Sequence, residues 1–416
     1  MRLVEAVKKR KRNLFALANA ISFSLSPFLL NYLLIRHLDG QDIHEAIFIL
    51  TLINTIGLTL FLSVDLLVPR YLLDSDYSQS SIFLFSLRTN LIFATLTFFT
   101  ISIVLLFEES SGQNFFATFL YIFSMAVFFT SRSVLGGSNQ FSKAFYLTIL
   151  DFFASLGLLA ITVTIGKLYF WSILGSVAIS RIVTCALWLG FFHTKAQLVN
   201  REVPAKELIW SKELFKVIVN LVTVVAGLQF LNNLPLLLIS KSSMSNTELI
   251  QIVVLIQIVR GLYGLLSGFQ SRSLNILNEI NLRISGLTQK QVLVNNIKII
   301  IIVFFILLAI FLWKGAYIMS IYTSNNVTFN TVVFALILVN ESLLYLFGIL
   351  RLILISIRRV FMLNVVIGFT VLSLVVSWIF LNELNLGILY SMGISTLLGI
   401  STLYFSTFLS KKAVRN

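Results

Sequence analysis

The chain has 416 residues, of which 58% are hydrophobic and only 12% are charged. Soluble domains carry about twice that share of charged residues, so the composition excludes a soluble globular protein. The formal net charge of +14 does not indicate nucleic-acid binding, because the Lys and Arg residues lie mostly between long apolar segments. That placement is typical of the orientation signals of a membrane protein.

The apolar segments predict an all-α polytopic membrane protein with about twelve transmembrane helices, because about 20 apolar residues are needed to cross a bilayer core of about 30 Å. Helices are expected because lipid offers no hydrogen-bond partner to a free backbone group. The first segment, Leu14 to Ile35, is longer than the apolar part of a signal peptide, and we interpret it as a retained span. The predicted spans are 13–36, 44–68, 83–107, 115–137, 141–166, 168–193, 213–240, 247–271, 291–314, 329–352, 359–382 and 386–409.

The positions of Lys and Arg between these spans predict the orientation. Most of them fall on the side of the membrane that carries the amino terminus, and this predicts that both termini are cytoplasmic. Arg88, Arg181, Arg260 and Lys298 fall inside spans. The opposite side holds only Arg36, Lys167, Lys241 and Lys314. The connections on that side are short, namely 37–43, 108–114, 167, 241–246, 315–328 and 383–385.

The long connection 194–212 predicts a division of the chain into two lobes. It is polar and basic, and we interpret it as a cytoplasmic linker between a six-helix lobe at 1–193 and a second six-helix lobe at 213–416. The pattern Phe28-Leu29-x-Asn31 recurs as Phe230-Leu231-x-Asn233 at the corresponding point of the second half. Since both halves begin in the cytoplasm, the lobes are expected to be related by a parallel pseudo-repeat, with the axis along the membrane normal.

Four ionisable residues fall well inside predicted spans, namely Asp151, Arg181, Arg260 and Glu341. Such residues are costly in the membrane and face a cavity or a partner. Two interpretations stay open. The residues can pair within their halves and hold helices together. Alternatively, Arg181 and Arg260 line an aqueous cavity and bind an anionic headgroup, while Asp151 or Glu341 binds a coupling H⁺ or Na⁺.

Arg260 is the strongest candidate for substrate binding. Gln257, Arg260 and Gly264 lie on one face of the predicted helix. The planar guanidinium group suits phosphate because it can donate to two oxygens at once. The alternative is a helix-packing seam, since small residues such as Gly264 let helices approach closely.

The first and seventh predicted spans carry matching polar segments. Asn19 precedes Pro27 in the first span, and Asn233 precedes Pro235 in the seventh. Asn19 and Asn233 are therefore further candidates for a substrate cavity, and the prolines can bend both helices. Ordinary hydrogen bonding between helices is the alternative interpretation.

Asp65 lies near the cytoplasmic end of the second span, and Arg88 is expected at a similar depth in the third. Their pairing would form a cytoplasmic gate or a structural salt bridge, and this is favoured over contact with substrate.

No pattern in the sequence predicts catalysis, a cofactor or a metal site. Cys185 is the single cysteine, so internal disulfides and multi-thiolate metal sites are excluded. The three histidines, His37, His44 and His193, have no metal-ligand spacing.

Two opening segments resemble a known family. The first reads Ser24-x-Ser26-Pro27-Phe28-Leu29-Leu30 and continues as Leu33-Leu34-Ile35-Arg36-His37-Leu38-Asp39-Gly40. The second closes as Asp65-Leu66-Leu67-Val68-Pro69-Arg70-Tyr71-Leu72. They resemble the polysaccharide biosynthesis proteins, the Wzx-type lipid-linked oligosaccharide (O-antigen) flippases of the MATE-like MOP superfamily. The segment Asn232-Asn233-Leu234-Pro235-Leu236-Leu237-Leu238 is similar to a second-half motif of that family but lacks its acidic residue.

The resemblance implies two lobes around a cationic cavity that opens alternately to each face of the membrane. It implies an undecaprenyl-diphosphate-linked glycan as substrate, with the bilayer and other glycan-assembly membrane proteins as partners. A small-molecule antiporter of the MATE group and a membrane-embedded glycan polymerase or transferase are the alternatives. The longest outer connection, 315–328, contains no Asp, Glu or His, which disfavours the enzyme.

Overall fold

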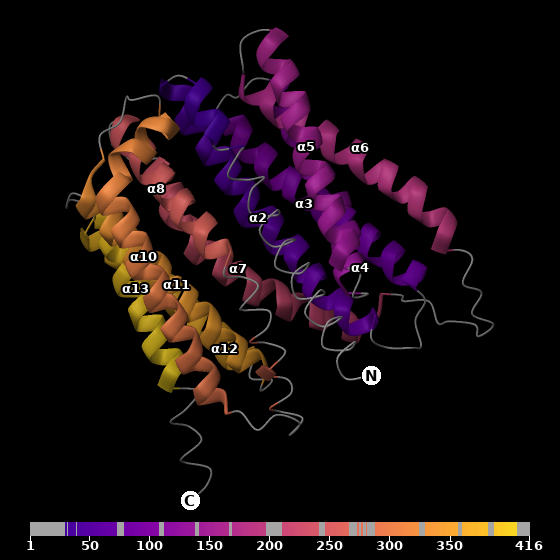
Figure 1. Ribbon diagram of the computed structural model, residues 1–416. Helices are drawn as coiled ribbons and strands as arrows, with labels where there is room; N and C mark the ends of the chain where they lie inside the picture. The colour runs from indigo at the N-terminus through magenta and orange to yellow at the C-terminus, as the bar shows by residue number, and fades with distance from the viewer. Residues whose placement is uncertain are drawn as a thin grey trace, which may run out of the picture. The chain divides into compact units, whose positions relative to one another are not determined.

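The computed structural model describes residues 30–405, apart from 31, 39, 73–78, 108–111, 138–140, 166–168, 197–209, 241–245, 266–272, 274–275, 278–279, 281–287, 324–328, 357–359 and 382–386. Within these ranges the regular structure is helical, with no strand (Figure 1). The chain divides into two compact units, 1–226 and 227–416. The division falls inside a helix, whereas the sequence predicts a boundary at 194–212, most of which lies outside the described residues.

The described residues of unit 1 form five complete helices and the start of a sixth, and among these α4 contacts most of the others. It packs against α2, α3, α5 and α6. The ring of Phe129 on α4 stacks on that of Phe61 on α2, with centroids 5.9 Å apart, and Phe128 packs with Leu147 and Cys185. The helices are α2 (Gly40–Leu72), α3 (Gln79–Phe107), α4 (Gly112–Gly137), α5 (Phe141–Ile165), α6 (Phe170–Ala196) and α7 (Lys212–Ser240), the last of which continues into unit 2.

A ladder of hydroxyl groups runs along the buried face of α2. Thr55, Thr59 and Ser63 recur every four residues and lie on one face of the helix. Each hydroxyl donates to the backbone carbonyl four residues earlier in the same helix. These polar groups are therefore satisfied within α2 and need no partner on another helix.

Unit 2 is organised around α11, which contacts α8, α10, α12 and α13. The rings of Phe311 on α10 and Phe334 on α11 stack with centroids 4.3 Å apart. Gly399 of α13 has no room for a side chain, because a Cβ atom there would lie 2.5 Å from Thr370 Oγ1 and 2.8 Å from Phe347 Cε2. The helices are α8 (Asn246–Leu265), α10 (Gln289–Thr323), α11 (Thr331–Ser356), α12 (Val360–Leu381) and α13 (Gly387–Tyr404).

Side-chain caps define where two helices of unit 2 begin. Asn330 accepts hydrogen bonds from the backbone N–H groups of Val332 and Val333 at the start of α11. Thr288 and Gln291 form a reciprocal capping box at the start of α10. These caps satisfy backbone donors that the first turn of a helix leaves free.

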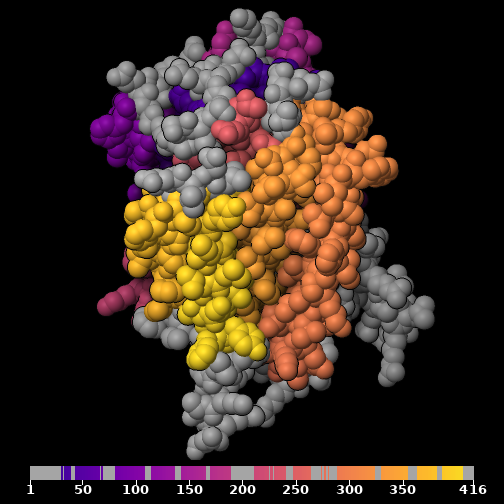
Figure 2. All heavy atoms as spheres, turned by 90° about the vertical axis from the view of Figure 1, so that its left-hand side faces the viewer, coloured from indigo at the N-terminus to yellow at the C-terminus, as the bar shows by residue number. Residues whose placement is uncertain are grey.

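The outer surfaces of the helices are strongly apolar. In the described part of the chain, nine helices are long and apolar enough to cross a membrane, or ten if the two stretches of α7 count as one span. Only 22% of the spanning window of α10 is buried, so most of this helix faces outward. Phe305 and Phe380 are 62% and 79% exposed, and Figure 2 shows the outer face formed by the orange and yellow helices of unit 2. The chain is a multi-pass membrane protein.

Most predicted spans correspond to observed helices, with two differences. The first span, 13–36, lies mostly outside the described residues. The prediction that 315–328 is a connection is wrong for residues 315–323, because α10 continues to Thr323. Nothing between Ala316 and Thr323 breaks a helix, and Gly315 lets Phe329 approach so closely that a Cβ would lie 2.5 Å from its ring.

Candidate functional site

Arg260 and Glu341 form an ion pair within unit 2. Arg260 lies on α8 and Glu341 on α11, two helices that pack against each other. Arg260 Nε donates to Glu341 Oε1 over 2.7 Å. The side chain of Glu341 is 6% exposed and that of Arg260 is 23% exposed. The carboxylate is therefore buried, whereas the guanidinium group keeps accessible surface.

Arg260 also contacts the backbone of α7. Its second terminal nitrogen donates to the carbonyl oxygen of Asn232. Pro235 follows within the next turn of α7. A proline inside a helix has no N–H to donate and disturbs the preceding turn. Arg260 thus donates to a part of α7 whose own hydrogen bonding the proline weakens.

Amide side chains lie on the same two helices. Asn233, which is 9% exposed, donates from Nδ2 to Gln229 Oε1 over 3.2 Å along α7. Gln257 lies one turn before Arg260 on α8, and its Oε1 is buried with no hydrogen-bond partner among the described residues. A buried acceptor in this state is costly unless water or a ligand bonds to it. Gln257 is therefore a polar group that can receive a ligand next to Arg260.

The neighbours of Glu341 in the chain fix its position. Asn340 donates to the carbonyl oxygen of Leu389 on α13 over 2.8 Å. On the other side, Ser342 shares a hydrogen bond with the hydroxyl of Tyr263 on α8. The carboxylate is thus held between two anchored residues, and the turn that carries it cannot easily rotate.

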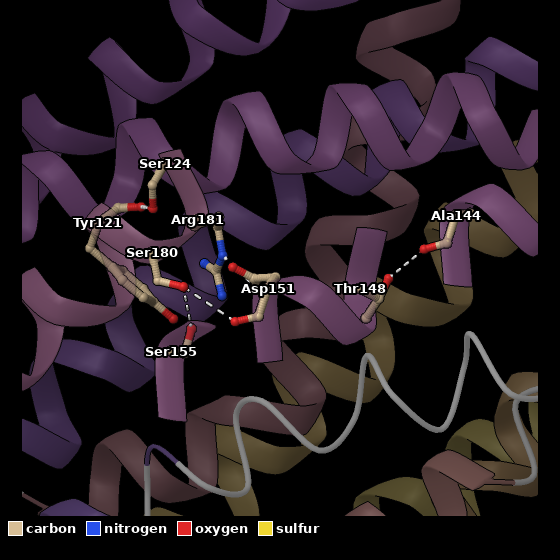
Figure 3. Close-up of polar contacts among 8 residues, drawn as sticks. All are labelled: Tyr121, Ser124, Ala144, Thr148, Asp151, Ser155, Ser180 and Arg181. Carbon is tan, nitrogen blue, oxygen red and sulfur yellow. Dashed lines mark hydrogen bonds and ion pairs between the residues drawn. The ribbon is translucent and has the colours of Figure 1, made fainter. Parts of the chain in front are cut away.

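A second ion pair lies within unit 1 and is shown in Figure 3. Arg181 Nε on α6 donates to Asp151 Oδ2 on α5 over 3.4 Å, and the side chains are 8% and 2% exposed. The two helices are joined further by Ser180, which donates to the backbone carbonyl of Asp151 over 3.3 Å and accepts from Ser155 over 3.1 Å. Asp151 Oδ1 has no hydrogen-bond partner among the described residues.

Aromatic rings enclose the guanidinium group of Arg181. Its carbon Cζ lies 5.4 Å from the ring centroid of Tyr121 and 5.2 Å from that of Phe128, both on α4. Such contacts stabilise a cation where water is excluded. Arg181 is therefore sealed among α4, α5 and α6, in contrast to Arg260.

The predicted gate residues lie in different surroundings. Asp65 of α2 is half-buried and accepts a hydrogen bond from the hydroxyl of Ser133 on α4. The side chain of Arg88 on α3 is exposed. The pairing of Asp65 with Arg88 stays a prediction. In the structure, Asp65 accepts a hydrogen bond from Ser133 and interacts electrostatically with Arg132, both on α4.

A cavity of about 440 Å³ lies in unit 2, on the surfaces of α10, α11 and α13. Its lining is almost wholly apolar and does not include Arg260 or Glu341. The lining residues are Leu293, Ile297, Leu346, Leu350, Ile400, Ser401, Tyr404 and Phe405.

The four ionisable residues that the sequence places well inside predicted spans thus form two pairs, each within one unit. Among the candidates named from sequence, Arg260, Gln257 and Asn233 lie on the adjoining helices α7 and α8, and Asn19 lies outside the described residues. The contacts with Tyr121, Phe128 and the Asn232 carbonyl were not predicted. No sequence pattern indicates which backbone carbonyl will accept a hydrogen bond from a side chain, or which aromatic rings will pack against a guanidinium group. In the described part of the chain, no group of three His, Cys, Asp or Glu side chains is arranged to hold a metal ion.

Comparisons with known proteins identify the fold. No protein-family model and no curated protein sequence matches the chain. Solved structures do match over nearly their whole length. An outward-facing multidrug resistance MATE family transporter of the MOP superfamily has a TM-score of 0.67 at 12% identity, covering 97% of this chain and 96% of that one. An inward-facing MATE transporter has a TM-score of 0.60 at 14% identity, with 96% of both chains covered.

A third structure is a MOP superfamily transporter from Pyrococcus furiosus Vc1, with a TM-score of 0.60, 13% identity and coverage of 98% of this chain and 96% of that one. The chain therefore has the fold of the MATE transporters of the MOP superfamily. The prediction of an all-α polytopic membrane protein with this architecture is confirmed.

Proposed function

We propose that the protein is a transporter that moves an undecaprenyl-diphosphate-linked polysaccharide repeat unit, of the O-antigen type, across the bacterial cytoplasmic membrane by alternating access. The fold supports transport, because structures with the same fold were captured in outward-facing and inward-facing conformations. The observation that carries the choice of substrate is the guanidinium group of Arg260, which is 23% exposed on a helix that the sequence predicts to span the membrane.

The chemistry of a lipid-linked glycan fits these residues. Its hydrocarbon tail is stable in lipid, whereas its diphosphate and sugars cannot enter hydrocarbon without large desolvation costs. Arg260 offers planar donors to phosphate, and the amides of Gln257 and Asn233 offer hydrogen bonds that replace water. Transport of this kind makes and breaks no covalent bond, so it requires no catalytic group.

The exposure of Arg260, beside the buried carboxylate of Glu341, supports an anionic substrate over a drug cation. In the MOP superfamily transporter from Pyrococcus furiosus, reverse polarity of the binding pocket suggests a different function. By the same reasoning, a pair in which the Arg is accessible and the acid is buried favours an anion in this chain. Glu341 serves in this proposal as the group that binds a coupling proton, and Asp65 with Arg88 remains the proposed gate.

We assign the sealed pair of unit 1 to helix packing. Arg181 and Asp151 are 8% and 2% exposed, so neither reaches a passing headgroup without disruption of the bundle. The proposed substrate-binding role of Arg181 and the proposed coupling role of Asp151 are therefore the weaker parts of the sequence-based hypothesis.

A MATE-type small-molecule antiporter is the second candidate, and the multidrug transporters that share the fold favour it. It predicts that purified protein in proteoliposomes takes up a cationic dye when a proton or sodium gradient is imposed. The lipid-linked glycan transporter predicts no such uptake.

Deletion of the gene tests the proposal directly. We expect surface glycan to be lost and lipid-linked precursor to accumulate inside the cell. Arg260→Ala should fail to restore export at normal protein levels, whereas Lys298→Ala, an exposed basic residue of α10, should restore it. Full export by the Arg260→Ala strain would remove the site assignment, and a deletion strain without precursor accumulation would remove the function.

A further inference from the structure

In the structure, Glu341 is already paired with Arg260, the cation to which the proposed function assigns the binding of substrate. Arg260 Nε is bonded to Glu341 Oε1 at 2.7 Å, and a terminal nitrogen is bonded to the Asn232 carbonyl. A diphosphate that approaches Arg260 therefore meets a second negatively charged group, because the carboxylate of Glu341 is already hydrogen-bonded to the same guanidinium group. Two anionic groups that share one cation in a region of low dielectric repel each other strongly.

A proton removes this conflict. Once a phosphate takes the guanidinium group, the carboxylate of Glu341 is left buried without a paired cation, a state that is much more costly than the protonated form. The anchors at Asn340 and Ser342 hold the turn in place, so the side chain cannot easily escape to solvent.

We propose, on the basis of the function inferred above, that binding of a diphosphate headgroup at Arg260 is coupled to the uptake of one proton by Glu341. The proton and the anion then bind together and cross in the same conformational step. A cationic substrate would behave in the opposite way, because it would compete with the proton for the carboxylate.

The surroundings of Glu341 offer no other cation for it among the described residues. On α8, the titratable groups that face it are Arg260 and Tyr263. The described part of α12 has no titratable side chain, and the tyrosines of α13 are exposed. On α11 itself, Tyr345 follows one turn later, and Arg351 follows ten residues later. The lysines of α10 are all exposed, namely Lys290, Lys298 and Lys314.

Calorimetric titration of the purified full-length protein with farnesyl diphosphate tests this coupling. The titration is run in detergent micelles at one pH in two buffers of different ionisation enthalpy, which gives the number of protons taken up per ligand. We expect the wild-type protein to take up about one proton more than Glu341→Gln, because the ligand's own protonation is common to both. Relative to this variant, wild-type affinity should weaken by up to about tenfold per pH unit as the pH rises.

An infrared difference spectrum provides a second measurement that does not depend on the folding of the Gln variant. Addition of farnesyl diphosphate to the wild-type protein should produce a band of a protonated carboxyl group. Glu341→Asp, which keeps a titratable group, should shift that band. Arg260→Ala should abolish both the band and the binding.

The outcomes separate this inference from the function on which it rests. Binding of farnesyl diphosphate that requires Arg260, together with uptake of the extra proton and the carboxyl band, supports both the coupling and the proposed function. Binding that requires Arg260 without either proton signal overturns the coupling and leaves the proposed function intact. A wild-type protein that does not bind farnesyl diphosphate overturns the anionic site, and the coupling with it.

Discussion

Arg181 Nε lies 3.4 Å from Asp151 Oδ2, and two aromatic rings pack against the guanidinium group of Arg181. This enclosure distinguishes the pair from the one formed by Arg260 and Glu341. The side chain of Arg181 is 8% exposed, against 23% for Arg260. Both pairs join neighbouring helices, but only one of them leaves its cation within reach of a ligand. The same combination of residue types therefore encloses the cation in one unit and leaves it accessible in the other.

Removal of either member of the enclosed pair should destabilise unit 1. Asp151→Leu leaves the Arg181 guanidinium group buried without its counter-ion, and such changes cost about 3–5 kcal/mol of folding free energy. Thermal unfolding in detergent, followed by tryptophan fluorescence, measures the loss. The double variant Asp151→Leu with Arg181→Met removes both charges and should recover most of the stability. A single variant as stable as the wild type would show that the pair contributes nothing to packing.

The hydrogen bond between Asp65 and Ser133 should exceed any coupling between Asp65 and Arg88. A hydrogen bond to a charged group contributes about 1.5–3 kcal/mol, whereas an interaction with the exposed Arg88 should contribute less than about 1 kcal/mol. Two double-mutant cycles, one with Asp65→Asn and Ser133→Ala and one with Asp65→Asn and Arg88→Ala, measure both terms. A larger coupling energy between Asp65 and Arg88 than between Asp65 and Ser133 would contradict this expectation and support the pairing that the sequence predicts.

Two glycines of unit 2 form a matched pair for a packing experiment. Gly399→Ala places a methyl group 2.5 Å from Thr370 Oγ1, and overpacking of this kind costs about 1–3 kcal/mol. A Cβ at Gly368 has no neighbour within 4 Å, so Gly368→Ala should be neutral or stabilising by up to about 1 kcal/mol, because alanine favours helix. Unfolding midpoints in the same detergent compare them, and equal midpoints would contradict the close approach of α12 and α13.

Single cysteines can test the proposed orientation. The native Cys185 is 0% exposed and should not react with a membrane-impermeant maleimide, so it provides a silent background. The exposed residue Lys314 is predicted to lie on the outer side and Lys290 on the cytoplasmic side. Lys314→Cys should be labelled in intact cells, and Lys290→Cys only after permeabilisation. The reverse result would invert the predicted topology of unit 2.

The sequence predicts the helices of this fold well because the membrane imposes a simple constraint. Long apolar segments must be helical in lipid, and the predicted spans from 44–68 onward coincide with observed helices within a few residues in most cases. The end of α10 was missed because a connection was inferred where hydropathy falls, although no residue from 316 to 323 stops a helix.

The site is less predictable than the fold. The sequence identifies Asp151, Arg181, Arg260 and Glu341 as unusual, since a charge inside a span is rare. Which acid meets which base depends on the rotation of each helix about its axis, and packing of several neighbours sets that rotation. The enclosure of Arg181 by Tyr121 and Phe128 depends on the same rotations, so residues of α4 gave no sign of their role.

The hydroxyl ladder of α2 has a consequence for motion. Because Thr55, Thr59 and Ser63 bond to carbonyls of their own helix, the faces that α2 presents to its neighbours meet mainly through van der Waals contacts. Sliding or tilting of α2 along α3 and α4 would then break few directional bonds along this stretch. This stretch of α2 lies between two hydrogen bonds that join the helix to α4, one from Asn114 to Glu45 and one from Ser133 to Asp65, and these are the contacts that such a movement would have to break.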